Sequence, residues 1–391
     1  MKTIRRPLRL WILAILPGLS LFGQTAPTNM KLFLLIGQSN MSGRGSLTDP
    51  IAAELPFPSS TAPRIWMLDE NDDWVPAANP MHFDVASPGY GLASRFAWEL
   101  ASADPDLHVG LIPCAVGGSG IGSWEKGDPN YDRAKDRALI AQNHGQLAAI
   151  LWHQGESNTT SYSTYCDRFA TLIGNMKHDL GVPSIPVIAG EIGRFHSNQA
   201  NINTELNKLP TRVPFCLTAS SWNLTHVGDN SHFNTPSLAT LGERYLDHYL
   251  AVSTWRGIEA ESLSWTTSGP AIETHSGIVE ASNESWIVFK ATADGQWLEA
   301  TTPVIPAGTY SVRVRFKRYN SRGQYQLSID GSNQGSAKEQ YASATSYFEH
   351  VHGLKTFATS GTHTIRFTAT GKHASSASRY LSIDSVVLQP Q

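Results

Sequence analysis

Apolar residues in the first 250 positions fall into short runs, separated by longer stretches in which they recur every three or four residues. The short runs are typical of buried strands and the longer stretches of amphipathic helices. The predicted strands are residues 32–36, 109–114, 150–153, 185–190 and 215–218, and the predicted helices are residues 91–101, 131–145, 161–180, 197–209 and 238–250. This alternation predicts a three-layer, flavodoxin-like α/β fold with helices on both faces of a parallel sheet.

The pattern changes near Trp255. Helical spacing disappears beyond residue 257, and short alternating runs broken by Gly, Asn and Ser follow, at residues 285–290, 309–317, 324–330, 363–369 and 380–388. Such runs are typical of a β-sandwich. The 391 residues therefore predict two domains, an α/β domain over 26–254 and a smaller all-β sandwich over 257–391.

The first predicted strand stops at Gly37 and is followed by Gln38, Ser39 and Asn40. In open α/β sheets, ligands and chemistry collect at the carboxyl ends of the strands, which makes Ser39 a candidate nucleophile. The alternative is that Ser39 caps the next helix. A serine nucleophile needs a base within hydrogen-bond reach and a group that orients that base.

Asp229 and His232 offer such a pair. They stand three residues apart, just ahead of the helix predicted at 238–250. A loop that turns into a helix can point both side chains the same way, so that the carboxylate fixes the tautomer of an imidazole facing Ser39. A helix cap is again the alternative.

Donors for the oxyanion that forms when serine attacks a carbonyl follow two further strands. Gly117 and Gly118 come after residues 109–114, and glycines let backbone amides approach a ligand closely. Gln154 comes after residues 150–153 and carries a side-chain amide. Because all of these groups fall at strand ends, the sequence predicts a single site at one edge of the sheet.

Four ordered motifs carry a family resemblance: GQSNMSGRG, LIPCAVGGSGIGSWEKG, LWHQGESN and DNSHFN. Over roughly residues 30–250 the chain resembles the SGNH hydrolases, and within them the sialate O-acetylesterase and acetylxylan esterase group, carbohydrate esterase family six. The resemblance implies that Ser39 is the nucleophile, His232 the base and Asp229 its orienting group.

The same resemblance implies an oxyanion hole. It would be formed by the Ser39 amide, one glycine of the Gly117 and Gly118 pair, and Gln154. The wider superfamily has an asparagine in the third of these blocks, where this chain and the esterase group have the glutamine. Spacing alone leaves open which glycine donates.

Three other residues lie beside these groups. Trp124 follows the glycine pair, and it either lines an acyl or sugar pocket or belongs to a surface turn. Arg44 and Glu156 lie on loops that flank the candidate catalytic groups. A carboxylate near an oxyanion opposes its formation, so we expect Arg44 to pair with Glu156 and brace the site.

The second domain opens with IEAE and closes with LSIDSVVL, which resemble carbohydrate-binding modules of the jelly-roll type. Glu259 and Glu261 share one face of a strand, where two carboxylates repel unless solvent or a hard cation separates them. In those modules the equivalent acids and an aspartate on the last strand hold a structural calcium ion. The resemblance thus implies Ca²⁺ at Glu259, Glu261 and Asp384, and solvated edge charges are the alternative.

The N-terminus has the pattern of a secretory signal. The apolar stretch 10–22 is shorter than the ~20 residues of a membrane span, and basic residues precede it, namely Lys2, Arg5, Arg6 and Arg9. Residues 1–25 are therefore predicted to be a signal peptide of a secreted or periplasmic protein, with an uncleaved anchor as the alternative. The formal net charge of -3 gives no basic field for nucleic acid, and no membrane partner is expected after cleavage.

These features together predict a secreted carbohydrate O-acetylesterase that needs no cofactor for catalysis. Its expected partner is an acetylated polysaccharide or oligosaccharide of the acetylxylan type. The alternatives are a sialate O-acetylesterase, a lipase-like acyl hydrolase and a non-catalytic secreted glycan-binding protein. The presence of Ser39, Asp229 and His232 argues against the last, and the lack of an extended apolar lid sequence argues against a lipase-like enzyme.

Overall fold

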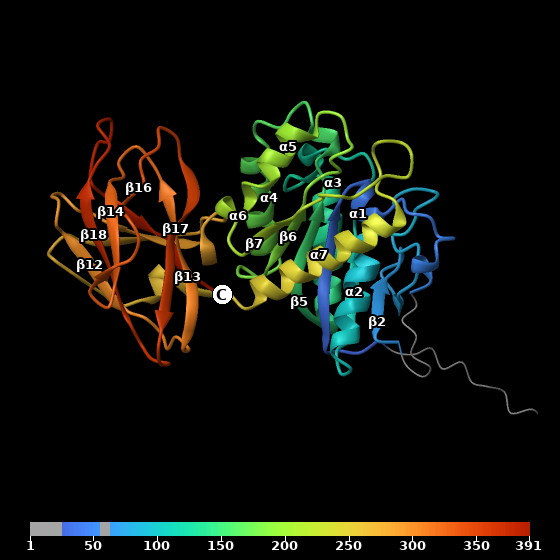
Figure 1. The fold of residues 1–391 in the computed structure, drawn as a ribbon, viewed down its shortest axis with the longest axis horizontal. Helices are drawn as coiled ribbons and strands as arrows, with labels where there is room; N and C mark the ends of the chain where they lie inside the picture. Colours follow the sequence, from blue (N-terminus) through green and yellow to red (C-terminus); the bar gives the residue numbers. More distant parts are fainter. Residues whose placement is uncertain (1–25, 55–62) are drawn as a thin grey trace, which may run out of the picture.

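A seven-stranded sheet forms the centre of the N-terminal part of the chain (Figure 1). The computed structural model describes residues 26–54 and 63–391, so the predicted signal peptide lies outside the described residues. The strand order is β3-β2-β4-β1-β5-β6-β7, and only β2 and β3 pair in antiparallel fashion. The strands are β1 (Met30–Gly37), β2 (Ile65–Leu68), β3 (Trp74–Pro76), β4 (Val109–Pro113), β5 (Gly145–His153), β6 (Val187–Gly190) and β7 (Cys216–Ala219). The sequence-based prediction omits β2 and β3, because four and three residues are too few to show a period.

Helices cover both faces of this sheet, which confirms the predicted three-layer α/β fold (Figure 1). Along β1, Phe33 and Leu35 pack in one core with α2 and α7, whereas Leu32 and Leu34 pack in another with α3 and α4. None of the helices in the described part of the chain is long and apolar enough to cross a membrane. The helices are α1 (Ser39–Ser42), α2 (Leu92–Ala103), α3 (Pro129–Ala141), α4 (Tyr165–Asp179), α5 (Gln199–Leu206), α6 (Leu209–Arg212) and α7 (Thr235–Ser253).

The carboxyl end of β1 is the point where the strand order of the sheet reverses. β1 lies between β4 and β5, so the chain turns to opposite sides of it in successive connections. β1 ends at Gly37, which pairs with His153 of β5. The φ of Gly37 is +130°, and a Cβ there would lie 2.2 Å from the His153 carbonyl oxygen, so only glycine fits. This close pairing brings the residues after β1 next to those after β5.

Three antiparallel sheets make up the chain from β8 onward, which confirms the predicted β-sandwich (Figure 1). Their orders are β10-β11-β19, β15-β14-β18-β12-β9 with β16 beside β14, and β17-β13-β20-β8. Inward-facing side chains such as Phe289, Val314 and Phe367 form a common core. The strands are β8 (Arg256–Glu259), β9 (Trp265–Thr267), β10 (Ile272–Ser276), β11 (Ser285–Phe289), β12 (Trp297–Thr301), β13 (Gly308–Arg318), β14 (Gln324–Ile329), β15 (Ser332–Asn333), β16 (Lys338–Glu339), β17 (Ser346–Phe357), β18 (Thr364–Gly371), β19 (Leu381–Ile383) and β20 (Ser385–Pro390).

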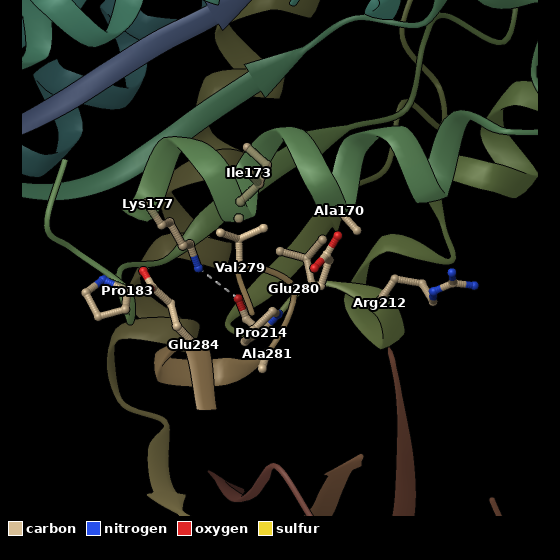
Figure 2. Close-up of a pocket in the computed structure, with 12 residues that line it drawn as sticks. Ala170, Ile173, Lys177, Pro183, Arg212, Pro214, Val279, Glu280, Ala281 and Glu284 are labelled. Carbon is tan, nitrogen blue, oxygen red and sulfur yellow. Dashed lines mark hydrogen bonds between the residues drawn. The ribbon is translucent and has the colours of Figure 1, made fainter. Parts of the chain in front are cut away.

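The two parts pack directly against each other. The guanidinium of Arg315 donates to the carbonyl oxygens of Arg212 and Glu280 at 2.8 and 2.7 Å, and so ties α6 to the sandwich. Figure 2 shows Lys177 of α4 pointing toward Pro214, whose carbonyl oxygen accepts from Nζ at 3.1 Å. The cavity drawn in Figure 2 has a volume of only about 10 Å³, which is too small for a ligand, whereas an adjoining groove of about 400 Å³ is lined by residues of both parts.

At Gly174 of α4, the absence of a side chain lets the backbone of the second part approach the helix closely. A Cβ at Gly174 would lie 2.3 Å from the carbonyl oxygen of Val279. We expect Gly174→Ala to lower the free energy of unfolding by about 1–3 kcal/mol, because the backbone of the second part must move away. Calorimetric unfolding checks this, with Gly361→Ala as control since its Cβ would meet nothing within 4 Å. Equal Tm values for the two variants would contradict the prediction.

Candidate active site

Ser39 and His232 meet at the carboxyl end of β1. Ser39 begins the short helix α1 and is 6% exposed. The turn from strand to helix places its Oγ 2.9 Å from Nε2 of His232, although the two residues are far apart in the sequence. The structure thus brings the candidate nucleophile and the candidate base within hydrogen-bond distance.

Asp229 holds the other side of the His232 ring. Its Oδ2 lies 2.6 Å from Nδ1 of His232, and its Oδ1 accepts the backbone N–H groups of Ser231 and His232, both at 2.9 Å. Partial burial raises the pKa of Asp229, but these hydrogen bonds and the ring outweigh burial and lower the pKa to about 2. An ionised carboxylate favours a proton on Nδ1, which leaves Nε2 to accept the hydrogen of Ser39.

Backbone and side-chain hydrogen bonds hold the loop between β7 and α7 in a closed turn next to His232. His226 and Phe233 form an antiparallel bridge across the loop. Nδ1 of His226 accepts the backbone N–H groups of Gly228 and Asn230 at 3.0 and 3.1 Å. This closed turn fixes the backbone just before His232.

The cap of α7 is Asn234. Its side chain accepts the backbone N–H of Ser237 at 3.0 Å. The alternative in which Asp229 and His232 cap this helix is therefore wrong, because the cap position is already filled. Asp229 bonds to the His232 ring, and that ring faces Ser39.

Asn40 is a site residue that sequence reasoning missed. Its Nδ2 donates to Oε1 of Glu156 at 2.5 Å and to the carbonyl oxygen of Ser231 at 3.0 Å. Its Oδ1 accepts the backbone N–H of Phe233 at 3.1 Å. Asn40 therefore ties the residues on both sides of His232 to the end of β1. Its place directly after the serine was the only signal in the sequence.

The predicted pair of Arg44 and Glu156 does not form. Nη2 of Arg44 lies 3.1 Å from Oδ2 of Asp84 instead. Glu156 is buried, bonds to Asn40 and lies 3.7 Å from Nε2 of His153. Burial raises the pKa of Glu156, but His153 and Asn40 outweigh it and lower the pKa below its ordinary value. Each charge thus has a nearer partner than the one that the sequence predicted.

Asp84 joins the segments that follow β1 and β4. Its Oδ2 accepts the backbone N–H of Gly117 at 2.7 Å, and its Oδ1 accepts from the hydroxyl of Ser42. Burial raises the pKa of Asp84, but Ser42, Arg44 and Gly117 together lower it. No sequence signal pointed to Asp84, because it lies in a loop without a motif and acts only through contacts made on folding.

Gln154 cannot serve as the predicted oxyanion donor in this geometry. The residue is fully buried, and its Nε2 donates to Oε1 of Gln38 at 3.1 Å, to the carbonyl oxygen of Ser119 at 3.1 Å and to Oδ1 of Asn158 at 2.7 Å. Two amide hydrogens facing three internal acceptors leave none for a ligand. The prediction of Gln154 as an oxyanion donor is therefore wrong. Its side chain instead links Gln38, Ser119 and Asn158 inside the protein.

The amide of Gln38 is the one with a free donor. Its Oε1 accepts from Gln154 and from the backbone N–H of Ser157 at 3.3 Å, while its Nε2 has no acceptor among residues 26–54 and 63–391 and is not sealed from solvent. In the glycine pair, the N–H of Gly117 already donates to a carboxylate. Gly118, with φ of +75° and open space beside its Cα, is the glycine whose amide is left for a ligand.

Gln38→Glu tests this assignment with little change of shape. The glutamate keeps an oxygen for the internal donors of Gln154 and Ser157, but it replaces the free NH₂ by an oxygen. We expect kcat for ester hydrolysis to fall about 10²–10³-fold, as for loss of one oxyanion donor. Steady-state kinetics on 4-nitrophenyl acetate, with circular dichroism as a check on folding, measure the effect. A kcat close to that of the unsubstituted protein would show that this amide does not donate.

Asn40→Ala tests the attachment of the His232 loop. The substitution removes the donor to Ser231 and the acceptor for Phe233, and it leaves the Glu156 carboxylate without that donor. We expect kcat to fall about 10²-fold with a smaller change in KM, because His232 is displaced while the substrate pocket remains. The kcat and KM values for one acetyl ester check it. A fall confined to KM contradicts a positioning role for Asn40.

The family profile for carbohydrate esterase, sialic acid-specific acetylesterase, matches residues 29–251. The chain belongs to this family. A probable carbohydrate esterase of Arabidopsis thaliana is 31% identical in an alignment 240 residues long that covers 56% of this chain and 90% of that relative. The X-ray structure of the plant protein aligns with a TM-score of 0.52 at 28% identity, covering 57% of this chain and 98% of its own. A carbohydrate acetylesterase from Xanthomonas citri aligns over 85% of this chain and 74% of its own, at 15% identity and a TM-score of 0.43.

Trp124 belongs to the core of this carbohydrate esterase domain. It is fully buried, its Nε1 donates to Oγ of Ser119 at 2.9 Å, and its ring lies 5.6 Å from that of Trp152 in an edge-on contact. The expectations of a pocket wall or a surface turn are both wrong. Trp124 instead stabilises the segment after β4 from the inside.

The three acidic residues of the predicted calcium site each have a protein partner. Asp384 lies 3.0 Å from Nε of Arg315, while Glu259 and Glu261 accept from the side chains of Ser282 and Asn283, both at 2.9 Å. Burial raises the pKa of Glu259 to about 7. One oxygen of Glu259 and one of Glu261 are buried without a partner, yet no group of three His, Cys, Asp or Glu side chains in the described chain could hold a metal ion. Burial raises the pKa of Asp384 well above its ordinary value even though Arg315 opposes this shift, and the calcium site at these three residues stays a prediction.

Proposed function

We propose that this protein is a secreted carbohydrate O-acetylesterase that works through an acyl-enzyme on Ser39. The observation that carries the proposal is the 2.9 Å separation between Oγ of Ser39 and Nε2 of His232, with Asp229 on the far side of the ring. Membership in a family of carbohydrate esterases supports the same reaction class.

In the first step, Oγ of Ser39 attacks the carbonyl carbon of an acetyl ester while Nε2 of His232 takes the hydroxyl proton. The new negative charge on the carbonyl oxygen is met by the amides of Ser39, Gly118 and Gln38. The tetrahedral intermediate then collapses, and the proton on His232 passes to the departing sugar oxygen. The products of this step are the free sugar hydroxyl and an acetyl group on Ser39.

The second step repeats this chemistry with water. His232 takes a proton from a water molecule, whose oxygen attacks the acetyl carbonyl of the Ser39 ester. Collapse returns the proton to Oγ and releases acetate. Asp229 remains ionised throughout, because its low pKa keeps the carboxylate charged beside the imidazolium that forms in each step.

The proposed substrate is an acetylated polysaccharide of the acetylxylan type. Acetyl is a small group, so selectivity must come from the alcohol side of the ester. The β-sandwich resembles carbohydrate-binding modules, and a polymer held there would be kept close to the esterase domain. Free sialic acid acetyl esters are the second candidate, which the family name favours.

Acetate release is the direct test. Purified protein is given acetylated xylan, acetylated mannan, an O-acetylated sialic acid and 4-nitrophenyl acetate, and acetate is measured for each. The proposal predicts release from at least one polysaccharide and covalent labelling of Ser39 by a fluorophosphonate. Labelling with release from sialic acid alone would favour the second candidate. No labelling and no release would leave a glycan-binding protein as the answer.

A further inference from the structure

Trp222 is an exposed aromatic side chain at the same edge of the sheet as Ser39. It follows β7 by three residues and begins the loop that leads to His232. Trp222 is 59% exposed. Such exposure is unusual for a tryptophan, because its large indole ring is mostly apolar and is buried in most proteins. An exposed indole near the candidate active site can bind a ligand that has an apolar face.

Buried contacts hold Trp222 in place. The carboxylate of Glu191, just after β6, is 2% exposed and accepts the backbone N–H of Ser221 at 2.9 Å. The same carboxylate lies 2.9 Å from Nη2 of Arg194. The guanidinium of Arg194 sits over the Trp222 ring, 5.1 Å from its centroid. One face of the indole is therefore covered by a fixed cation, and the exposed area lies on the rest of the ring.

The segment that carries Arg194 also contacts the proposed catalytic loop. Phe195, next to Arg194 in the chain, lies 4.9 Å from the His226 ring and 5.1 Å from the Phe233 ring. His226 and Phe233 form the bridge that encloses His232. The segment carrying Arg194 thus packs against the loop that begins near Trp222 and presents the base.

We infer that Trp222, with Arg194 at its side, is a binding platform for a sugar ring on the alcohol side of the ester. A pyranose has an apolar face of C–H groups that stacks on an indole, and hydroxyl groups that accept from a guanidinium. An acetyl group offers little to recognise, so a platform beside the base would select the sugar that carries it. This inference deepens the proposed function and rests on it.

The test compares substrates with and without a sugar. We measure the ratio of kcat/KM for acetylated xylo-oligosaccharides to kcat/KM for 4-nitrophenyl acetate, and the same ratio for acetylated manno-oligosaccharides. For Trp222→Ala at least one ratio is expected to fall about tenfold, through KM more than kcat, because only the sugar loses a contact. Trp222→Phe should recover most of the loss, since it keeps an aromatic face.

Leu250→Ala is the matched control. Leu250 is also an exposed apolar residue, at 46%, but it lies near the carboxyl end of α7, whereas His232 precedes the amino end of that helix. Both ratios should stay within twofold of the unsubstituted value. Ratios that also stay within twofold for Trp222→Ala overturn the platform, and so does an equal loss on the sugar and non-sugar esters.

A binding measurement separates this inference from the proposed function. Titration calorimetry with xylohexaose and mannohexaose compares Ser39→Ala with the double variant Ser39→Ala, Trp222→Ala. Weaker binding by the double variant supports the platform even if no acetate is released from any ester. Equal affinities of the two variants for both sugars overturn it even if hydrolysis occurs.

Discussion

Replacement of Ser39 by alanine is expected to lower kcat for acetyl ester hydrolysis by about 10⁴-fold or more, because the attacking oxygen is removed. The residual rate would come from the oxyanion donors and from substrate binding, which the substitution leaves in place. Folding should be unaffected, since the side chain is small and its hydroxyl contacts only His232 among the described residues. Acetate release and 4-nitrophenolate release both measure the effect.

Ser102→Ala provides the comparison for Ser39→Ala. Ser102 lies at the exposed end of α2, where its hydroxyl donates to the carbonyl oxygen of Trp98 and to no other group among the residues that the structure describes. Its loss should change kcat by less than about twofold. Near-native turnover of a folded Ser39→Ala protein would falsify the proposed nucleophile, and with it the acyl-enzyme mechanism.

Replacement of His232 by alanine is expected to be almost as damaging, with kcat lower by about 10⁴-fold. The substitution removes the ring nitrogen that lies 2.9 Å from Oγ of Ser39 and would take its proton. Asp229 cannot replace it, because an aspartate carboxylate is too weak a base near neutral pH, and its contact is with the far side of the missing ring.

Added imidazole distinguishes a missing base from a damaged fold. A free imidazole that enters the space left by the ring should restore part of the activity of His232→Ala, in proportion to its neutral fraction. The rescued rate should therefore rise with pH. Activity of His232→Ala within tenfold of the unsubstituted protein would mean that another group takes the proton. Asp229→Ala should lose less than either variant, because it orients the base without receiving the proton.

The fold was predictable because local patterns repeat along the chain. In β1, every residue from 32 to 36 is apolar, and such a run is what burial on both faces of a parallel sheet requires. Strands as short as β2 and β3 leave no such pattern. They form because β4 offers β2 an edge to pair with, and β2 in turn offers an edge to β3.

The oxyanion hole shows the limit of sequence reasoning. Gln38 and Gln154 both follow strands, both carry amides, and their side chains bond to each other. Which of the two side chains has an N–H free for a ligand depends on which amide hydrogens are already donated to acceptors inside the protein. The amide hydrogens of Gln154 are donated to Ser119 and Asn158. Such hydrogen bonds join residues that have no fixed spacing in the sequence.

The sequence by itself determined the alternation of the longer strands and helices and the change to a β-sandwich. It also determined Ser39, Asp229 and His232 as residues of one site, because strand ends in a parallel sheet converge. The tertiary structure alone decided the partners of the charged and amide side chains. Arg44 bonds to Asp84, Glu156 to Asn40, and Asp384 to Arg315. The physical reason is that a buried charge pairs with whatever donor folding brings within about 3 Å, and that distance is set by packing and not by spacing along the chain.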